Sequence, residues 1–334
     1  MPAVSILLPA RDEERYLPAA LDSIFRQTFT DWELVAVDDG SRDTTPAILA
    51  AALRSDLRVR LLRPSSRGLT AALNAGLEAC RAPLIARMDA DDISHPRRLE
   101  TQVAFLTQNP GVGLVACDFR SFPRAALGRG MVAYERWQNS LASHEDILRD
   151  LFVESPFVHP SVMFRGEEVL SVGGYRDRGW AEDYDLWLRL AAAGTRFARL
   201  QRTLFFWRER PERATRTLPE YTAAAFRACK AHHLRSTFLK GVDEVILAGA
   251  GLEGRAWRRA LLGEGIRVAG WVDVDPGKIG RTLHGAPVSA AHEVTAEDGV
   301  KMLVTVGTRG ARHQIRKWAD GAGFVEGVDY LCVT

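Results

Sequence analysis

Short apolar runs alternate with helical patterns along the amino-terminal part of the chain. The runs have the length and composition of buried strands, and they cover residues 4–9, 32–37, 58–62 and 82–86. The segments between them place apolar residues on one helical face, as Leu17, Leu21 and Ile24 do after the first run. Alternating strands and helices are typical of a mainly parallel sheet with right-handed crossovers, so the sequence predicts an α/β fold.

Polar loops follow three of these runs at their carboxyl ends, at residues 11–13, 38–41 and 89–92. In open parallel sheets, ligands bind beyond the carboxyl ends of the strands. We therefore expect the three loops to lie side by side in one crevice. Each loop taken alone also fits a turn or a helix cap.

The third loop carries three carboxylates, Asp89, Asp91 and Asp92, directly after a buried strand. Clustered carboxylates repel one another, and a hard divalent cation that also holds phosphate oxygens relieves this repulsion. The alternative is a solvated acidic loop in which Asp92 or Ser94 caps the next helix. The pattern thus indicates either a metal site or a capped turn.

Several motifs, taken in order, resemble those of family 2 glycosyltransferases, which have the GT-A fold. The matching segments are residues 4–13, 37–44, 68–76, 88–99, 159–165, 173–175 and 181–189. The resemblance implies a nucleotide pocket lined by Pro9, Arg11, Glu13, Asp38, Asp39, Arg67 and Asp89. In that pocket Asp39 would contact the uracil edge of a uridine diphosphate and Asp89 the ribose. It also implies that Asp91 binds Mn2+ or Mg2+ and that Asp183 is the catalytic base.

The chemistry of sugar transfer explains these residue types. Displacing a diphosphate from an anomeric carbon develops positive charge on the sugar ring and negative charge on the leaving oxygens. A metal held by carboxylates such as Asp91 would stabilise the leaving group, and a carboxylate such as Asp183 would accept the proton of the attacking hydroxyl. Attack opposite the leaving group predicts inversion at the anomeric carbon.

Three residues near the expected base have two interpretations each. His159, Glu182 and Trp187 are candidates for contact with the acceptor or the diphosphate. A lone histidine such as His159 is also common as a structural residue, and Glu182 and Asp183 also fit first-turn acids favoured by a helix dipole. Trp187 lies at helical spacing from Asp183, which fits a core residue equally well.

Composition and charge narrow the class of protein. The 334 residues are 46% hydrophobic and 26% charged, which suits a globular chain of two domains, and the net charge of +2 gives no argument for nucleic-acid binding. The four cysteines form no CxxC pair, which favours reduced thiols in a cytosol. Met1 leads directly into a strand, and no apolar run has membrane-spanning length, so we expect a cytoplasmic protein.

Arginines are frequent between residues 199 and 240, among aromatic residues. A basic helix of this kind can lie on an anionic membrane surface, which would suit a lipid-linked acceptor and a location at the inner face of the plasma membrane. The alternative is a solvated connecting segment.

The last part of the chain begins again with a strand, residues 245–248, followed by a GxGxxG turn and a helix. Gly249, Gly251 and Gly254 would allow a diphosphate to approach the helix, and Asp273 could bind ribose hydroxyls. The segment resembles the small nucleotide-binding modules at the front of sugar acyltransferases. It is either a second nucleotide site or a degenerate Rossmann module that serves assembly.

The sequence therefore predicts a GT-A domain over residues 1–205, a basic helical linker over 206–240 and a Rossmann-like α/β domain over 241–334. The predicted activity is metal-dependent, inverting transfer from a nucleotide sugar, expected to be a UDP-sugar, to a saccharide or lipid-linked hydroxyl. The expected setting is the synthesis of cell-surface polysaccharide or glycolipid. The alternatives are a sugar-nucleotide-binding regulator and an oxidoreductase centred on the GxGxxG turn. The sugar, the acceptor and assembly as a homo-oligomer are left open.

Overall fold

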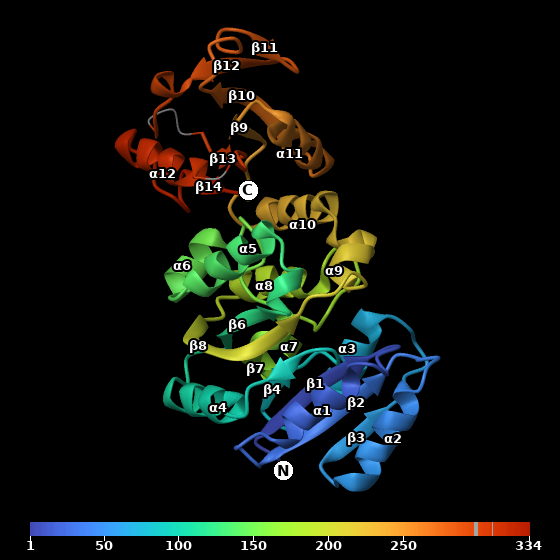
Figure 1. The fold of residues 1–334 in the computed structure, drawn as a ribbon. Helices are drawn as coiled ribbons and strands as arrows, with labels where there is room; N and C mark the ends of the chain where they lie inside the picture. The colour runs from blue at the N-terminus through green and yellow to red at the C-terminus, as the bar shows by residue number, and fades with distance from the viewer. Residues whose placement is uncertain (297–299, 309) are drawn as a thin grey trace. The chain divides into compact units, whose positions relative to one another are not determined.

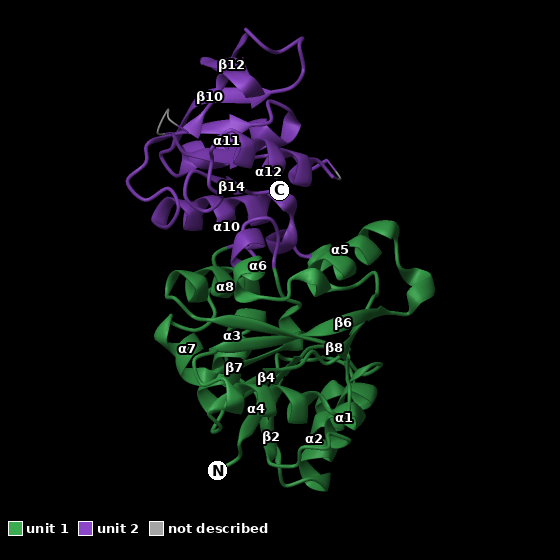
Figure 2. Cartoon of the chain, turned by 90° about the vertical axis from the view of Figure 1, so that its left-hand side faces the viewer, with its two compact units in different colours: residues 1–147, 156–178, 182–217 green, residues 148–155, 179–181, 218–334 purple. Residues whose placement is uncertain are grey.

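The structure is a computed structural model that describes residues 1–296, 300–308 and 310–334. The chain divides into two compact units, coloured separately in Figure 2. The amino-terminal unit comprises residues 1–147, 156–178 and 182–217, and the carboxyl-terminal unit comprises residues 148–155, 179–181 and 218–334. Each unit contains its own sheet, so the predicted α/β class is confirmed.

The sheet of the amino-terminal unit has the strand order β3-β2-β1-β4-β7-β6-β8-β5 (Figure 1). Its strands are β1 (Val4–Ala10), β2 (Trp32–Asp38), β3 (Val59–Leu62), β4 (Leu84–Arg87), β5 (Ile93–Ser94), β6 (Leu114–Phe122), β7 (Val162–Arg165) and β8 (Phe197–Arg208). The first four in sequence, β1 to β4, run parallel, whereas β7 runs antiparallel to both β4 and β6. This mixed sheet is the arrangement expected for the GT-A fold.

Helices of this unit follow most of its strands. They are α1 (Leu17–Phe25), α2 (Thr45–Ser55), α3 (Leu69–Ala79), α4 (Arg98–Gln108), α5 (Arg129–Ser140), α6 (His144–Asp150, which ends in the other unit), α7 (Gly166–Ser171), α8 (Glu182–Ala192) and α9 (Ala214–Thr217). Short 3-10 turns lie at Arg124–Ala126 and His159–Ser161. Helices α5 and α6 lie in a segment without clear hydrophobic periodicity, so they were not predicted.

The core of this unit fixes where the strands end. Val4, Ile6 and Leu8 of β1 are buried in one cluster with Leu17 and Leu21 of α1. Burying each such side chain contributes about 1.5–3 kcal/mol, so β1 is held firmly and the loop that follows it starts from a fixed point.

The opposite face of β1 is covered by α3. A Cβ added to Gly76 of α3 would lie 2.2 Å from Leu7 Cδ1, so a larger residue here would displace the Leu7 side chain. The small residues that the sequence places in this helix therefore serve its approach to the sheet.

The carboxyl-terminal unit has a sheet of order β11-β12-β10-β9-β13-β14. Its strands are β9 (Glu244–Ala248), β10 (Arg267–Asp273), β11 (Thr282–Leu283), β12 (Ala286–Ala290), β13 (Met302–Val304) and β14 (Tyr330–Cys332). Its helices are α10 (Ala223–Ser236), α11 (Leu252–Gly263) and α12 (Ala311–Gly321), with 3-10 turns at Pro219–Tyr221 and Ala291–Glu293. The strands pair in parallel except for the β11–β12 hairpin, as a Rossmann-like module requires.

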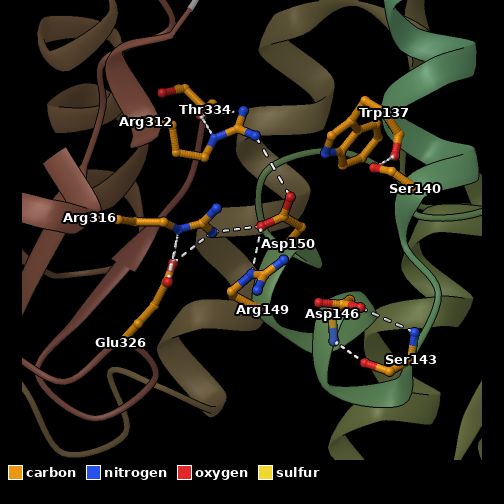
Figure 3. Close-up of polar contacts among 10 residues, drawn as sticks. All are labelled: Trp137, Ser140, Ser143, Asp146, Arg149, Asp150, Arg312, Arg316, Glu326 and Thr334. Carbon is orange, nitrogen blue, oxygen red and sulfur yellow. Dashed lines mark hydrogen bonds and ion pairs between the residues drawn. The ribbon is translucent and has the colours of Figure 1, made fainter. Parts of the chain in front are cut away.

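Residues 148–155 belong to this second unit although they lie early in the sequence. Asp150 Oδ1 accepts a hydrogen bond from Arg316 Nη2 at 2.6 Å, and Arg316 also pairs with Glu326 at 2.8 Å (Figure 3). Lys230 Nζ donates to Val153 O at 2.6 Å. Removing one partner of a buried ion pair is strongly destabilising, so a fragment that starts after residue 217 would lack part of its own fold. Experiments on this unit therefore need the full chain.

Candidate active site

The loops after β1 and β2 are joined by hydrogen bonds. Asp12 N donates a hydrogen bond to Ser41 Oγ at 3.1 Å, and Arg42 N donates to Asp12 Oδ1 at 2.7 Å. Asp38 Oδ1 accepts a hydrogen bond from Ser41 N at 2.9 Å, which holds the second loop in a tight turn. Pro9 is buried near the end of β1. The first two loops are thus brought side by side as the parallel sheet predicts.

Asp39 joins the second loop to the start of α3. The residue is 5% exposed, and its Oδ1 accepts a hydrogen bond from Gly68 N at 2.8 Å. Oδ2 lies 3.5 Å from Arg11 Nη1, while the exposed Arg67 side chain packs against Gly40. Four of the residues expected to line a nucleotide pocket, Arg11, Asp38, Asp39 and Arg67, therefore lie on connected loops.

Asp89, Asp91 and Asp92 have carboxylate oxygens within 4.8 Å of one another. Burial and the neighbouring carboxylates Asp91 and Asp89 raise the pKa of Asp92 well above its usual range, and burial and Asp89 raise the pKa of Asp91. Burial alone would raise the pKa of Asp89 too, but the Arg87 guanidinium outweighs it and leaves that pKa lowered. Asp92 Oδ2 is buried and accepts no hydrogen bond from the described residues. Crowded, partly unsatisfied oxygen ligands fit a hard divalent cation.

Arg87 is the buried cation behind this loop. Its side chain is 1% exposed, pairs with Asp89, and donates to Leu7 O at 3.1 Å and His159 Nε2 at 3.2 Å. Arg98 Nη2 donates to the carbonyl oxygen of Arg87 at 2.9 Å. The acidic loop is therefore held in place by charged hydrogen bonds from two elements.

A further arginine reaches the acids from the end of β8. Arg210 Nε donates to Asp91 Oδ2 at 2.9 Å, and its Nη2 pairs with Glu13 Oε1. Arg208 N donates to Asp92 Oδ1 at 2.6 Å. Burial and Asp91 raise the pKa of Glu13 to about 7, against the opposing effect of Arg210. Arg208 and Arg210 fall in the predicted linker, so their position at the site was not predicted from the sequence.

Asp183 is the second residue of α8. Its Oδ1 accepts a hydrogen bond from Tyr184 N at 2.7 Å. Burial and the neighbouring Glu182 raise the pKa of Asp183 well above its ordinary value, and Asp89 adds to this effect. Asp183 and the acidic loop therefore influence each other electrostatically.

The remaining candidates beside α8 are buried. His159 Nε2 lies 2.9 Å from Tyr175 Oη, and His159 Nδ1 lies 3.6 Å from Glu182 Oε1. Burial and Arg87 lower the pKa of His159. Trp187 is 0% exposed and packs edge-on against His159 at a ring-centroid distance of 5.7 Å. Trp187 therefore supports the histidine from the core and has no exposed surface to offer a substrate.

The GxGxxG turn of the carboxyl-terminal unit joins β9 to α11. A Cβ on Gly254 would lie 1.9 Å from Gly249 O, whereas a Cβ on Gly251 would meet open space. Asp273 Oδ2 accepts a hydrogen bond from Ala250 N at 2.9 Å, so this carboxylate already bonds the turn itself. Nucleotide binding at this turn stays a prediction.

The fold and the acidic sheet edge define a glycosyltransferase of the GT-A type. A family model described as "Glycosyl transferase family 2" matches residues 5–171, and the chain belongs to that family. The first solved structure to compare is TarS of S. aureus, with a TM-score of 0.55 and 17% identity over 78% of this chain and 69% of that one. This likeness confirms the predicted fold.

Two curated relatives have names that describe glycosyltransferases. The amylovoran biosynthesis glycosyltransferase AmsE of Erwinia amylovora is 34% identical over 59% of this chain and 72% of its own length. The UDP-Gal:alpha-D-GlcNAc-diphosphoundecaprenol beta-1,3-galactosyltransferase of Escherichia coli is 29% identical over 73% of this chain and 88% of its own. Within the described residues, every helix is too short or too polar to cross a bilayer.

Proposed function

We propose that this glycosyltransferase takes its sugar from a UDP-sugar and transfers it to a hydroxyl of a saccharide acceptor carried on a lipid diphosphate. The name of the Escherichia coli relative specifies a donor and an acceptor of these classes. TarS of S. aureus, which shares the fold, has been solved with UDP-GlcNAc. The proposed setting is the synthesis of cell-surface polysaccharide or glycolipid.

The observation that carries this proposal is the meeting of buried Asp39 and the Asp89–Asp92 loop at one edge of the sheet. A buried carboxylate beside Arg11 can accept hydrogen bonds from a base edge, and Asp89 can accept hydrogen bonds from ribose hydroxyls. The loop after β1 contacts both sides, because Arg11 pairs with Asp39 and Glu13 pairs with Arg210, which also bonds Asp91.

Asp91, together with Asp89 and Asp92, would hold Mn2+ or Mg2+. When bound, such an ion stabilises the negative charge that develops on the leaving diphosphate. The crowded carboxylates and the unsatisfied Asp92 Oδ2 support this assignment. Glu13 lies beside Asp91, since both pair with Arg210, and Arg87 supports Asp89 through an ion pair.

Asp183 is the proposed catalytic base. Its raised pKa makes the ionised carboxylate a stronger proton acceptor than an ordinary aspartate, and its helix is anchored by the buried residues Leu186 and Leu190. A base on the side opposite the leaving diphosphate removes the proton from the attacking hydroxyl. The product then has inverted configuration at the anomeric carbon.

The sequence predicts a catalytic domain over residues 1–205, a linker over 206–240 and a Rossmann-like domain over 241–334. Because Arg208 and Arg210 bond the acidic loop, we propose that the catalytic domain extends beyond residue 205. A lipid-linked acceptor would bring the protein to the inner membrane surface. Several arginines of the linker are already paired, as Arg216 is with Glu209 and Arg227 with Glu253. We therefore expect flotation with liposomes to depend on the acceptor lipid more than on anionic lipid.

The test is a donor screen with the full chain. The purified protein is incubated with a panel of UDP-sugars and a GlcNAc-diphosphate-lipid acceptor, with Mn2+ or with a chelator, and UDP release and product mass are measured. We expect metal-dependent UDP release with one donor and an inverted linkage by NMR. Transfer only from GDP- or dTDP-sugars, or full activity with the chelator, would contradict the proposal.

A further inference from the structure

Arg210 bonds two acids of the donor site at once. Its Nε donates to Asp91 Oδ2 at 2.9 Å, and its Nη2 pairs with Glu13 Oε1. The three side chains are largely buried, with 18% of Arg210, 13% of Asp91 and 12% of Glu13 exposed. A guanidinium in this position provides the positive charge that these carboxylates otherwise lack.

The proposed metal ligand and the arginine partner are thus the same carboxylate. A divalent cation that coordinates Asp91 directly would face the Arg210 guanidinium across a single carboxylate, and two cations at such a distance repel each other strongly where water is scarce. Arg210 and the cation therefore compete for Asp91.

We propose that Arg210 is an internal counter-ion of the donor site, which occupies Asp91 and Glu13 until a divalent cation arrives together with a diphosphate. This inference rests on the proposed function, because it presumes that Asp91 binds the metal. Arg210 thereby becomes a positioning residue that makes the binding of metal and of nucleotide depend on each other.

Metal binding depends on the nucleotide because a bound cation would deprive Arg210 of an acceptor. A cation binding alone would take Asp91 from a mostly buried guanidinium and leave that guanidinium with fewer acceptors, which is costly. A diphosphate brings new anionic oxygens into the same pocket, and these oxygens can replace the lost carboxylate as acceptors. Metal should therefore bind weakly alone and tightly with UDP.

The backbone around Arg210 is fixed, so the exchange involves its side chain. Arg208 N donates to Asp92 Oδ1 at 2.6 Å, and Glu209 N donates to Phe122 O at 2.7 Å. On the other side, Arg213 lies over the Trp207 ring at 3.5 Å. A rotation of the Arg210 side chain can free Asp91 while these contacts stay in place.

The experiment measures Mn2+ binding to the full chain by electron paramagnetic resonance of free Mn2+, with and without UDP. Three variants are compared with the wild type. Arg210→Met removes the guanidinium, and Arg210→Lys keeps the charge but cannot bond both carboxylates as the planar fork does. Arg216→Gln removes a positive charge from the same segment, where it pairs with Glu209 away from Asp91. Circular dichroism checks the fold of each variant.

We expect Mn2+ alone to bind Arg210→Met about tenfold or more tightly than the wild type, because the competing cation is gone. Arg210→Lys should also bind Mn2+ more tightly although its charge is unchanged, and it decides the question should Arg210→Met fail to fold. The factor by which UDP tightens Mn2+ binding, typically about 5–150-fold for coupled sites, should shrink in both variants. Arg216→Gln should resemble the wild type.

Two results would overturn the inference in distinguishable ways. If wild-type protein binds Mn2+ better with UDP and the Arg210 variants behave like wild type or like Arg216→Gln, the metal site stands and the role of Arg210 is refuted. If wild-type protein binds no Mn2+ even with UDP, the proposed metal site fails, and the counter-ion role fails with it.

Discussion

Replacing Asp183 with asparagine separates catalysis from stability. Asn keeps the size of the side chain and an oxygen that can accept the hydrogen bond from Tyr184 N. It removes a carboxylate whose pKa is raised well above its ordinary value by burial and by Glu182. We therefore expect the Asp183→Asn variant to lose activity and to gain stability.

The sign of the stability change follows from the pKa. Because the pKa of Asp183 is higher in the folded than in the unfolded state, its ionised form destabilises the fold above the folded-state pKa. This cost disappears as the pH falls below the unfolded-state value. Each pH unit by which the pKa is raised corresponds to about 1.4 kcal/mol. The Asn variant should thus have a free energy of unfolding at pH 8 that is about 1 kcal/mol or more above that of the wild type.

The kinetic change follows from the proposed role. Loss of a general base lowers kcat by about 100- to 10,000-fold. Wild-type activity should fall as the pH drops through the raised pKa of Asp183, so the acidic limb of its pH profile should lie above the range of an ordinary aspartate. Measuring kcat by UDP release and unfolding by urea denaturation at pH 8 tests both parts.

A contrasting variant lies on the same helix. Asp185 Oδ2 accepts a hydrogen bond from Arg189 Nε at 2.7 Å, so Asp185→Asn breaks a buried pair and should lower the free energy of unfolding by about 3–5 kcal/mol. The Asp185→Asn protein that remains folded should show the same dependence of activity on pH as the wild type. An Asp183→Asn variant that turns over within about tenfold of the wild type would refute the assignment of the base.

Three further predictions test other parts of the molecule. Burial alone would raise the pKa of Glu33, but hydrogen bonds, the first of them from Ser5, outweigh burial and leave this pKa lowered. The ionised Glu33 side chain therefore stabilises the fold above the unfolded-state pKa, and this stabilisation is lost as the pH falls through the folded-state pKa. Urea denaturation should find Glu33→Gln less stable than the wild type by about 1.5–3 kcal/mol at pH 7 and by less at low pH, and an equal difference at both would contradict this. Gly254→Ala puts a Cβ 1.9 Å from a backbone oxygen and should lower the stability of the carboxyl-terminal unit by about 1–3 kcal/mol in thermal unfolding, whereas Gly251→Ala, facing open space, should differ little. Asp91→Asn should weaken Mn2+ binding in the presence of UDP by about tenfold or more in a calorimetric titration, and unchanged binding would exclude Asp91 as a ligand.

The elements that carry the acids could be predicted because their signals are local. The run at residues 82–86 and the strand β4 (Leu84–Arg87) nearly coincide, and Asp89 follows directly. Parallel pairing of β1 with β2 and β4 then brings the three polar loops to one edge, as the alternation of elements implies. Both the strand and the position of its loop could therefore be predicted without knowledge of contacts between distant residues.

The segment between residues 119 and 155 had no such signal. It contains α5 (Arg129–Ser140), whose sequence mixes arginines, glycine and aromatic residues without a clear apolar face. Its stability comes from distant contacts, as when Glu135 Oε2 accepts a hydrogen bond from Ser121 N at 2.7 Å. Tertiary contacts of this kind are invisible to periodicity, which is why the helix was missed.

The arginines that contact the acidic loop could not be identified from local sequence patterns, although the need for positive charge there could have been inferred. The pocket holds four carboxyl groups, those of Glu13, Asp89, Asp91 and Asp92, and ion pairs connect two arginines to them, Arg87 and Arg210. The sequence indicates that such an acidic loop needs counter-charges, but only the fold selects Arg210 from a run of similar arginines. The same choice leaves Asp91 with two competing partners, and this competition makes metal binding depend on the donor.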